Sequence, residues 1–150
     1  MTQATPTEDE LKGFINSACK EVKKNDSFLF DADVSEWAIA HRLAVYLEKY
    51  FLKYHVDCEY NRMAGPDGSY SMRSPKRVHG TEKSRPDIII HHRGSDTSNN
   101  LIVVELKKTP SDKDNEFIKA MMTDQNFNYK YGCTILISDH TLTVNWLNKK

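Results

Sequence analysis

Two runs rich in β-branched residues constrain the fold of this chain more than any other feature. Residues 86–92 (PDIIIHH) and 101–107 (LIVVELK) each have the length of a strand, and the polar segment 93–100 (RGSDTSNN) separates them. Strands with apolar residues at successive positions are buried on both faces, because neighbouring side chains point to opposite sides of a sheet. The two runs therefore predict a hairpin with an extended connection, in which 101–107 is a central strand.

Three other segments carry apolar residues at the three-and-four spacing of an amphipathic helix, at about 7–24, about 34–54 and 111 to about 124. The first starts with Thr7 and Glu10, which form a capping-box pattern. The second is long and rich in good helix formers, so we expect it to be the central helix. Acidic residues in the first turn of the third segment favour a helix start there.

Three further strands complete the pattern. Residues 55–62 (HVDCEYNR) alternate between apolar and polar, while 133–138 (CTILIS) and 141–147 (TLTVNWL) flank an Asp139-His140 turn. The predicted order is helix, helix, strand, strand, strand, helix, strand, strand. This order predicts an α/β fold, with a mixed sheet of about five strands flanked by helices, and 150 residues suit a single domain.

The segment from about residue 63 to 85 has Gly, Pro and Ser at many positions and no periodicity, which predicts a long flexible loop. This segment is locally basic. The net charge of the whole chain is formally zero, however, and a neutral chain counts mildly against a general DNA-binding protein. We hypothesise that Lys76, Arg77 and Arg85 contact nucleic-acid phosphates from this loop. A solvated loop is the alternative.

The cysteines and the hydropathy of the chain indicate the cellular compartment in which we expect the protein. Cys19, Cys58 and Cys133 are widely spaced and each lies among apolar residues, which favours reduced core thiols over a disulfide framework or a zinc site. No run approaches the roughly 20 apolar residues that span a bilayer, and the first residues lack signal-peptide features. We therefore expect a soluble cytoplasmic protein with no membrane partner.

Charged residues interrupt the two apolar runs at positions that a hairpin would bring together. Because side chains alternate along 101–107, Glu105 and Lys107 share one face with Val103. Burying ionised groups costs several kcal/mol unless they are paired or metal-bound. Asp87 starts the preceding strand, so hairpin pairing would place it beside Glu105. Two such carboxylates form an oxygen-ligand site suited to Mg²⁺ or Mn²⁺.

These residues resemble the motif of the PD-(D/E)XK nuclease superfamily, in which a proline-aspartate at a strand start is followed by a hairpin and then by an acidic residue, any residue and lysine. Pro86-Asp87 and Glu105-Leu106-Lys107 match it. The resemblance implies a restriction-endonuclease-like core. It also implies that Asp87, Glu105 and the carbonyl of Leu106 hold a metal ion, while Lys107 orients or activates the attacking water.

The resemblance covers about residues 35–132, whose segments look like those of small, stand-alone bacterial members of unassigned substrate. Such nucleases commonly carry a further acidic residue on the helix before the sheet. Glu36 is the candidate, because it heads the apolar face of the predicted central helix. Asp33 and Glu36 also form a capping-box pattern, and the two roles are compatible.

Weaker candidates lie around this motif. Gln125 and Tyr129 fit the glutamine, three residues, tyrosine pattern of RecB-type exonucleases, although simple packing near a helix end is the alternative. The resemblance is the only reason to expect that Arg62 faces the cleft of the predicted active site. His91 and His92 follow the first apolar run, but adjacent strand residues face opposite ways, so we expect surface positions for them and at most one near the site.

The resemblance and the residues together predict a Mg²⁺- or Mn²⁺-dependent enzyme that hydrolyses phosphodiester bonds through Glu36, Asp87, Glu105 and Lys107. DNA is preferred to RNA because most of the superfamily acts on DNA. Specificity would come from a homodimer interface, a protein partner or the structure of the nucleic acid. The alternative is a non-catalytic nucleic-acid-binding or assembly module that retains the fold, and metal binding would separate the two.

Overall fold

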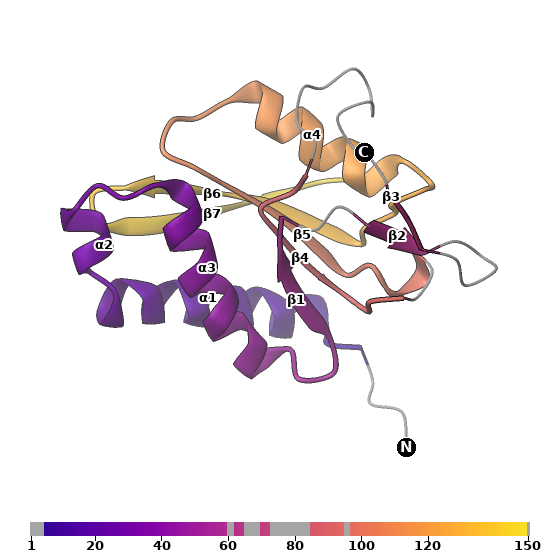
Figure 1. Ribbon diagram of the computed structural model, residues 1–150, viewed down its shortest axis with the longest axis horizontal. Coiled ribbons are helices and arrows are strands. Elements are labelled where there is room, and N and C mark those ends of the chain that lie inside the picture. Colours follow the sequence, from indigo (N-terminus) through magenta and orange to yellow (C-terminus); the bar gives the residue numbers. More distant parts are fainter. Residues whose placement is uncertain (1–4, 60–61, 65–69, 73–84, 95–96, 150) are drawn as a thin grey trace.

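The computed structural model of this protein has a mixed sheet with helices on both faces, which places it in the predicted α/β class (Figure 1). The structure describes residues 5–59, 62–64, 70–72, 85–94 and 97–149. No helix in these ranges combines the length and the apolar character that crossing a membrane requires.

The main sheet has five strands in the order β1-β4-β5-β6-β7. They are β1 (His55–Cys58), β4 (Ile88–His91), β5 (Ile102–Lys107), β6 (Tyr131–Ser138) and β7 (Thr141–Leu147). β4 and β5 form the predicted antiparallel hairpin, β5 and β6 are parallel, and the other pairs are antiparallel. All six residues of β5 are buried, which confirms that it is a central strand covered on both faces.

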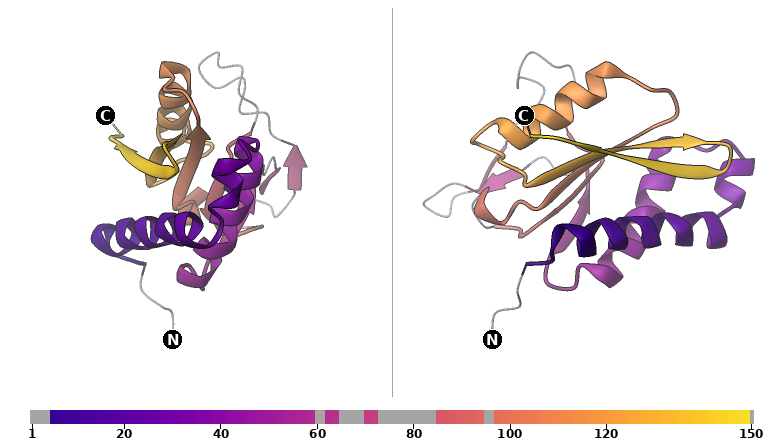
Figure 2. Two further views of the ribbon diagram at one scale, coloured as in Figure 1. Left: turned by 90° about the vertical axis from the view of Figure 1, so that its left-hand side faces the viewer. Right: turned by 180° about the vertical axis from the view of Figure 1, so that it is seen from behind.

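The helices cover the two faces of the sheet unequally (Figure 2). They are α1 (Glu8–Asn25), α2 (Phe28–Asp31), α3 (Glu36–Tyr50) and α4 (Asp112–Thr123). α1 and α3 pack on one face and α4 lies on the other. The predicted capping box at the start of α1 is confirmed, because the Thr7 N–H donates to Glu10 Oε1 at 3.0 Å and the Glu10 N–H donates to Thr7 Oγ1 at 3.2 Å.

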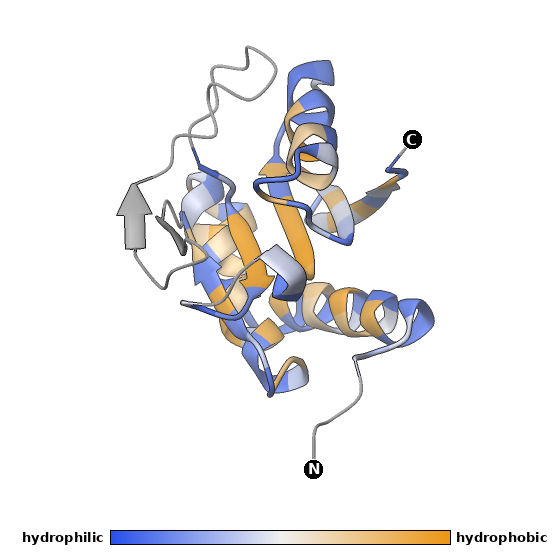
Figure 3. Cartoon of the chain, turned by 90° about the vertical axis from the view of Figure 1, so that its right-hand side faces the viewer, coloured by the Kyte–Doolittle hydropathy of each residue, from blue (hydrophilic) through white to orange (hydrophobic). Residues whose placement is uncertain are grey.

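Alternation along the central strands divides the core into two apolar layers. Ile88, Ile90, Val104 and Leu106 pack with α1 and α3, whereas the intervening side chains of β4 and β5 face α4. Figure 3 shows the apolar strands enclosed between the helices of the two faces. Glu105 and Lys107 therefore belong to the face that α4 covers.

The strand predicted at 55–62 is interrupted. β1 ends at Cys58, the next residue, Glu59, has a left-handed backbone with φ of 54°, and Arg62 already belongs to another strand. That strand, β2 (Arg62–Ala64), pairs with β3 (Tyr70–Met72) in a separate small sheet. The prediction of a continuous loop over about 63–85 was thus wrong at these strands, and 65–69 and 73–84 lie outside the described residues.

Two of the three cysteines occupy the predicted core positions. Cys19 and Cys133 are buried, and burial raises the pKa of the Cys19 thiol to about 12. Cys58 is exposed, so its predicted core position was wrong. The reason is that β1 is an edge strand of the sheet and Cys58 is its last residue.

Candidate active site

Asp87 and Glu105 lie against each other across the β4–β5 hairpin. The Asp87 N–H donates to Glu105 Oε1 at 2.8 Å, and the Leu106 N–H donates to Asp87 Oδ2 at 2.8 Å. Both side chains are almost completely buried, with 3% of Asp87 and 1% of Glu105 exposed. The pairing expected from the sequence is therefore confirmed.

The local backbone explains this geometry. The described β4–β5 register ends with Ile88 opposite Val104, so Asp87 comes just before the ladder and opposite Glu105. The Asp87 N–H therefore donates to the Glu105 carboxylate and not to a backbone carbonyl of β5. The Leu106 N–H in turn donates to the Asp87 carboxylate. Hydrogen bonds to ionised acceptors are stronger than those between neutral groups. The two backbone donors therefore fix the orientation of both carboxylates.

Lys107 follows two residues after Glu105 on the same face of β5 and is only 8% exposed. Its ammonium donates to the carbonyl oxygen of Ser111 at 3.3 Å. Within the described part of the chain this is its one hydrogen bond, and no carboxylate pairs with it. Lysine is almost never this buried unless its charge is paired, so the position favours contact with an anion.

Glu36, the first residue of α3, reaches the end of β5 from the opposite side of the sheet. Its Oε1 accepts a hydrogen bond from the N–H of Lys108 at 3.2 Å. It does not join Asp87 and Glu105 in one cluster, because the described residues contain no group of three His, Cys, Asp or Glu side chains that could hold a metal ion. Glu36 thus lies beside the predicted site and contacts its backbone.

The capping box predicted for Asp33 and Glu36 was wrong. Ser35 is the N-cap residue of α3, and Asp33 has a left-handed backbone with φ of 49° that turns it away from this position. Asp33 instead forms an ion pair of 3.0 Å with the Lys108 ammonium, which also donates to the carbonyl of Val34 at 2.6 Å. Lys108 therefore ties the segment before α3 to the end of β5.

The candidate nucleic-acid contacts are only partly described. Arg85 is exposed and its Nε forms an ion pair of 3.2 Å with Glu59 Oε2. Arg62 is the first residue of β2, and only its backbone is described. Lys76 and Arg77 lie outside the described residues. The phosphate-contact hypothesis for these four residues stays a prediction.

Gln125 and Tyr129 do not share a helix face. α4 ends at Thr123, and Gln125 is exposed in the turn that follows. Tyr129 is 4% exposed, packs in the apolar layer under α4, and donates its N–H to the carbonyl of Met121 at 3.1 Å. Burial, with a smaller contribution from the charge of Asp57, raises the pKa of the Tyr129 hydroxyl. The packing alternative accounts for Tyr129.

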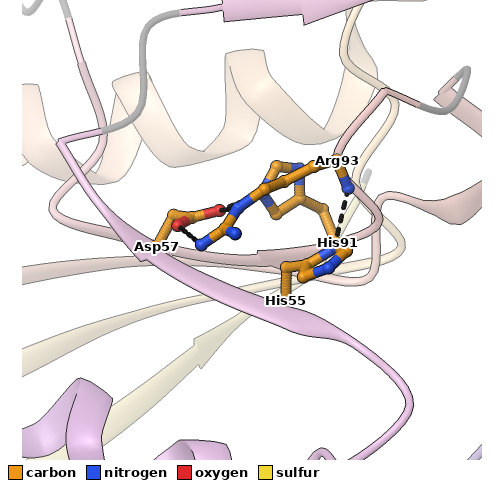
Figure 4. Close-up of polar contacts among 4 residues, drawn as sticks. All are labelled: His55, Asp57, His91 and Arg93. Atoms are coloured by element: carbon orange, nitrogen blue, oxygen red, sulfur yellow. Dashed lines mark hydrogen bonds and ion pairs between the residues drawn. The ribbon is translucent and has the colours of Figure 1, made fainter.

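A second polar cluster was missed in the sequence and joins the edge strand β1 to β4 (Figure 4). Nε2 of His91 donates to Asp57 Oδ2 at 2.7 Å, and Nε of Arg93 donates to the same oxygen at 2.8 Å, while a second guanidinium nitrogen contacts Asp57 Oδ1. The Arg93 N–H donates to Nδ1 of His55 at 3.0 Å. His91 is only 4% exposed, so its predicted surface position was wrong.

The alternation of β4 explains this burial. His91 lies two residues after Ile89 on the face that α4 covers, and Asp57 pairs with Ile89 across the strands. Burial alone would raise the pKa of Asp57, but hydrogen bonds and charge from His91 and Arg93 outweigh it and hold the pKa below its usual value. His91 lies four positions after Asp87, about 13 Å along an extended backbone, so it is separate from the carboxylate pair.

His92 points to other neighbours. Its ring lies 4.7 Å from that of Tyr54, measured between centroids, and 6.2 Å from that of His55. Partial burial, followed by the charges of His55 and His91, lowers the pKa of His92. His91, the last residue of β4, and His92, which follows it, thus take different environments.

Comparison with known proteins assigns no relative to this chain. No protein-family model matches the sequence, and no curated protein and no solved structure is significantly similar to it. Function is therefore inferred from the carboxylate pair, Lys107 and their surroundings.

Proposed function

We propose that this protein is a divalent-metal-dependent nuclease with a restriction-endonuclease-like PD-(D/E)XK core, which hydrolyses phosphodiester bonds in DNA rather than RNA. The contact between Asp87 and Glu105 carries the proposal, because two central strands bring two almost fully buried carboxylates together. The acidic hairpin β4–β5 and the helix that connects β5 to its parallel neighbour β6 support the same core.

The donor set suits Mg²⁺ or Mn²⁺. Asp87 and Glu105 supply carboxylate oxygens oriented by backbone N–H groups, and on this proposal the Leu106 carbonyl is a third ligand. Mg²⁺ is typically held by one or two carboxylates together with water and substrate phosphates, so a pair of carboxylates is sufficient. The bound ion would polarise the phosphodiester and favour the deprotonated form of the attacking water.

The remaining side chains act around this pair. The Lys107 ammonium, buried on the same face, stabilises the negative charge that grows on the phosphate oxygens as water attacks. Glu36 accepts from the backbone of Lys108 and so positions the end of β5 that carries Lys107. In this scheme Glu36 is a positioning residue.

Cleavage assays test the proposal. Linear, circular and single-stranded DNA, with RNA alongside, are incubated in Mg²⁺ or Mn²⁺ with the wild type, Asp87→Asn and Lys107→Met. Glu116→Gln and Lys119→Met, at exposed positions of α4, are the matched controls. We expect metal-dependent cleavage that falls roughly 100-fold or more in the first two variants and is unchanged in the controls.

Three other outcomes would contradict the proposal in whole or in part. If a folded, Mn²⁺-loaded wild type cuts none of the four substrates but binds one of them, the chain is a nucleic-acid-binding module and the enzymatic proposal fails. If Lys107→Met cleaves as fast as the wild type, the role assigned to the ammonium is wrong. Preference for RNA would overturn the substrate assignment alone.

A further inference from the structure

Lys107, which the proposed mechanism places at the cleaved phosphodiester, also lines a cavity that has no assigned role in the hydrolysis. The cavity has a volume of about 330 Å³ and lies between the start of α4 and the α4-facing side of β5, β6 and β7. This volume is at the lower end of the range for small-ligand sites. Its polar lining includes Lys107, Ser111, Asn115, Thr134, Thr143 and Asn145.

We propose that this cavity binds a second phosphate group of the nucleic acid, one that neighbours the cleaved phosphodiester. The inference rests on the proposed nuclease function for the identity of the ligand. Besides the carboxylate of Asp112, the lining combines an ammonium, three hydroxyls and two asparagine amides, all of which can donate hydrogen bonds to phosphate oxygens.

The buried ammonium of Lys107 favours an anion in this cavity. Lys107 has three N–H donors, and within the described residues only the Ser111 carbonyl accepts from one of them. A buried cation without a carboxylate partner is unfavourable unless another anion neutralises it. A phosphate group in the cavity would supply that charge directly beside Lys107.

Asn115 and Thr134 bring further polar groups to the cavity. Asn115 Oδ1 is buried and has no hydrogen-bond partner among the residues that the structure describes. The oxygen and nitrogen of an asparagine amide exchange places by rotation, so the NH₂ group can take this position and donate to a ligand. Thr134 is 1% exposed and lines the same cavity, which places its hydroxyl donor away from bulk water.

The start of α4, which borders the cavity, also favours an anion there. α4 has 12 residues, and its N-cap residue, Ser111, makes no side-chain hydrogen bond to the first turn. The first N–H groups of a helix carry partial positive charge and bind anions when no side chain caps them. Asp112 also lines the cavity, but it is exposed, so solvent screens its carboxylate more than the buried Lys107 charge.

A binding measurement without catalysis tests the cavity. Inorganic phosphate is titrated in EDTA into the wild type, Thr134→Val and Thr123→Val, and the rise in Tm is recorded. Thr134→Val removes the buried hydroxyl with little change of shape, whereas Thr123, at the end of α4, keeps its hydroxyl on the Lys119 carbonyl outside the cavity. We expect phosphate to stabilise the wild type and Thr123→Val, with an apparent Kd roughly tenfold weaker in Thr134→Val.

Cleavage kinetics identify the source of the phosphate. KM should rise roughly tenfold in Thr134→Val with kcat little changed. If only 5′-phosphorylated oligonucleotides lose affinity, the cavity takes a terminal phosphate, and if 5′-hydroxyl substrates lose it equally, it takes an internal one.

Failure of the cavity and failure of the nuclease proposal are distinguishable. Equal phosphate stabilisation of all three proteins, or none in any of them, overturns the cavity assignment even if the wild type cleaves DNA. Phosphate binding that Thr134→Val weakens, in a protein that cleaves nothing, retains the phosphate site and rejects the nuclease.

Discussion

Replacing Gly132 with alanine should destabilise the protein, because α4 packs directly against β6 at this residue. A Cβ atom at Gly132 would lie 2.5 Å from Cγ2 of Ile118 and 2.6 Å from Sδ of Met122. Favourable contacts between carbon atoms are about 3.5–4.0 Å long. Met122 is flexible and can move, but Ile118 is β-branched and restricted at χ1, so the helix itself must shift.

The magnitude follows from two opposing effects. Overpacking a core by an added methyl group typically costs about 1–3 kcal/mol. Alanine in place of glycine inside a strand recovers roughly 0.5–1 kcal/mol of backbone entropy. We therefore expect the free energy of unfolding to fall by about 1–2 kcal/mol.

Urea unfolding measures this change, and Gly13→Ala is the matched control. Gly13 is exposed in the middle of α1, and a Cβ atom there meets nothing within 4 Å. Gly13→Ala should stabilise the protein by roughly 0.5–1 kcal/mol, because alanine is the better helix former. If Gly132→Ala is as stable as the wild type while Gly13→Ala shows its gain, α4 does not approach β6 as described.

Further substitutions test other contacts. Thr7→Ala should lower the free energy of unfolding by about 1 kcal/mol through loss of the α1 capping box, and an unchanged Tm would show that the cap contributes nothing. Lys107→Met should stabilise the metal-free protein by roughly 1–3 kcal/mol in urea unfolding, because it removes a buried charge that no described carboxylate pairs with, and a loss of stability would contradict this environment. Since the folded pKa of Asp57 is depressed, its contribution is present above about pH 4 and is lost as the pH falls further. Asp57→Asn should therefore lose less stability than the wild type between about pH 5 and about pH 2. Stability that falls equally with pH in the two proteins would contradict the contact of Asp57 with His91 and Arg93.

The position of the carboxylate pair was predictable because it depends on short-range rules. Two apolar runs joined by a polar segment specify a hairpin, and alternation then decides which side chains share a face. Asp87 and Glu105 meet for these reasons alone, and Lys107 follows on the same face. The nuclease activity of these residues stays a proposal.

Features that depend on long-range placement were not predictable from the same patterns. The burial of His91 follows from the pairing of β1 with β4, which brings Asp57 from a separate segment of the chain. A partner 34 residues away leaves no local signal, although two consecutive histidines after an apolar run were a reason to examine the face of each. The cavity beside Lys107 likewise depends on long-range packing, because its lining comes from β5, β6, β7 and the start of α4.

Local backbone conformation caused the remaining errors. Asp33 and Glu59 have left-handed backbones, at the positions where the expected helix cap and the expected strand fail. Neither residue is glycine, which is the residue that usually marks such a conformation in a sequence. β2 and β3 are three residues each, too short for a periodic pattern to emerge among the surrounding Gly, Pro and Ser. Periodicity predicts long elements better than the junctions between them.

Binding of Mn²⁺ to the free protein, followed by electron paramagnetic resonance, tests most directly whether Asp87 and Glu105 form a metal site. The titration compares the wild type with Asp87→Asn, which keeps an oxygen acceptor for the Leu106 N–H but removes one ligand charge, and with Glu116→Gln as control. We expect one Mn²⁺ site in the wild type and the control, weakened by roughly tenfold or more in Asp87→Asn. Equal Mn²⁺ binding by all three proteins, or no binding by the folded wild type, would contradict the metal site and the nuclease mechanism proposed from it.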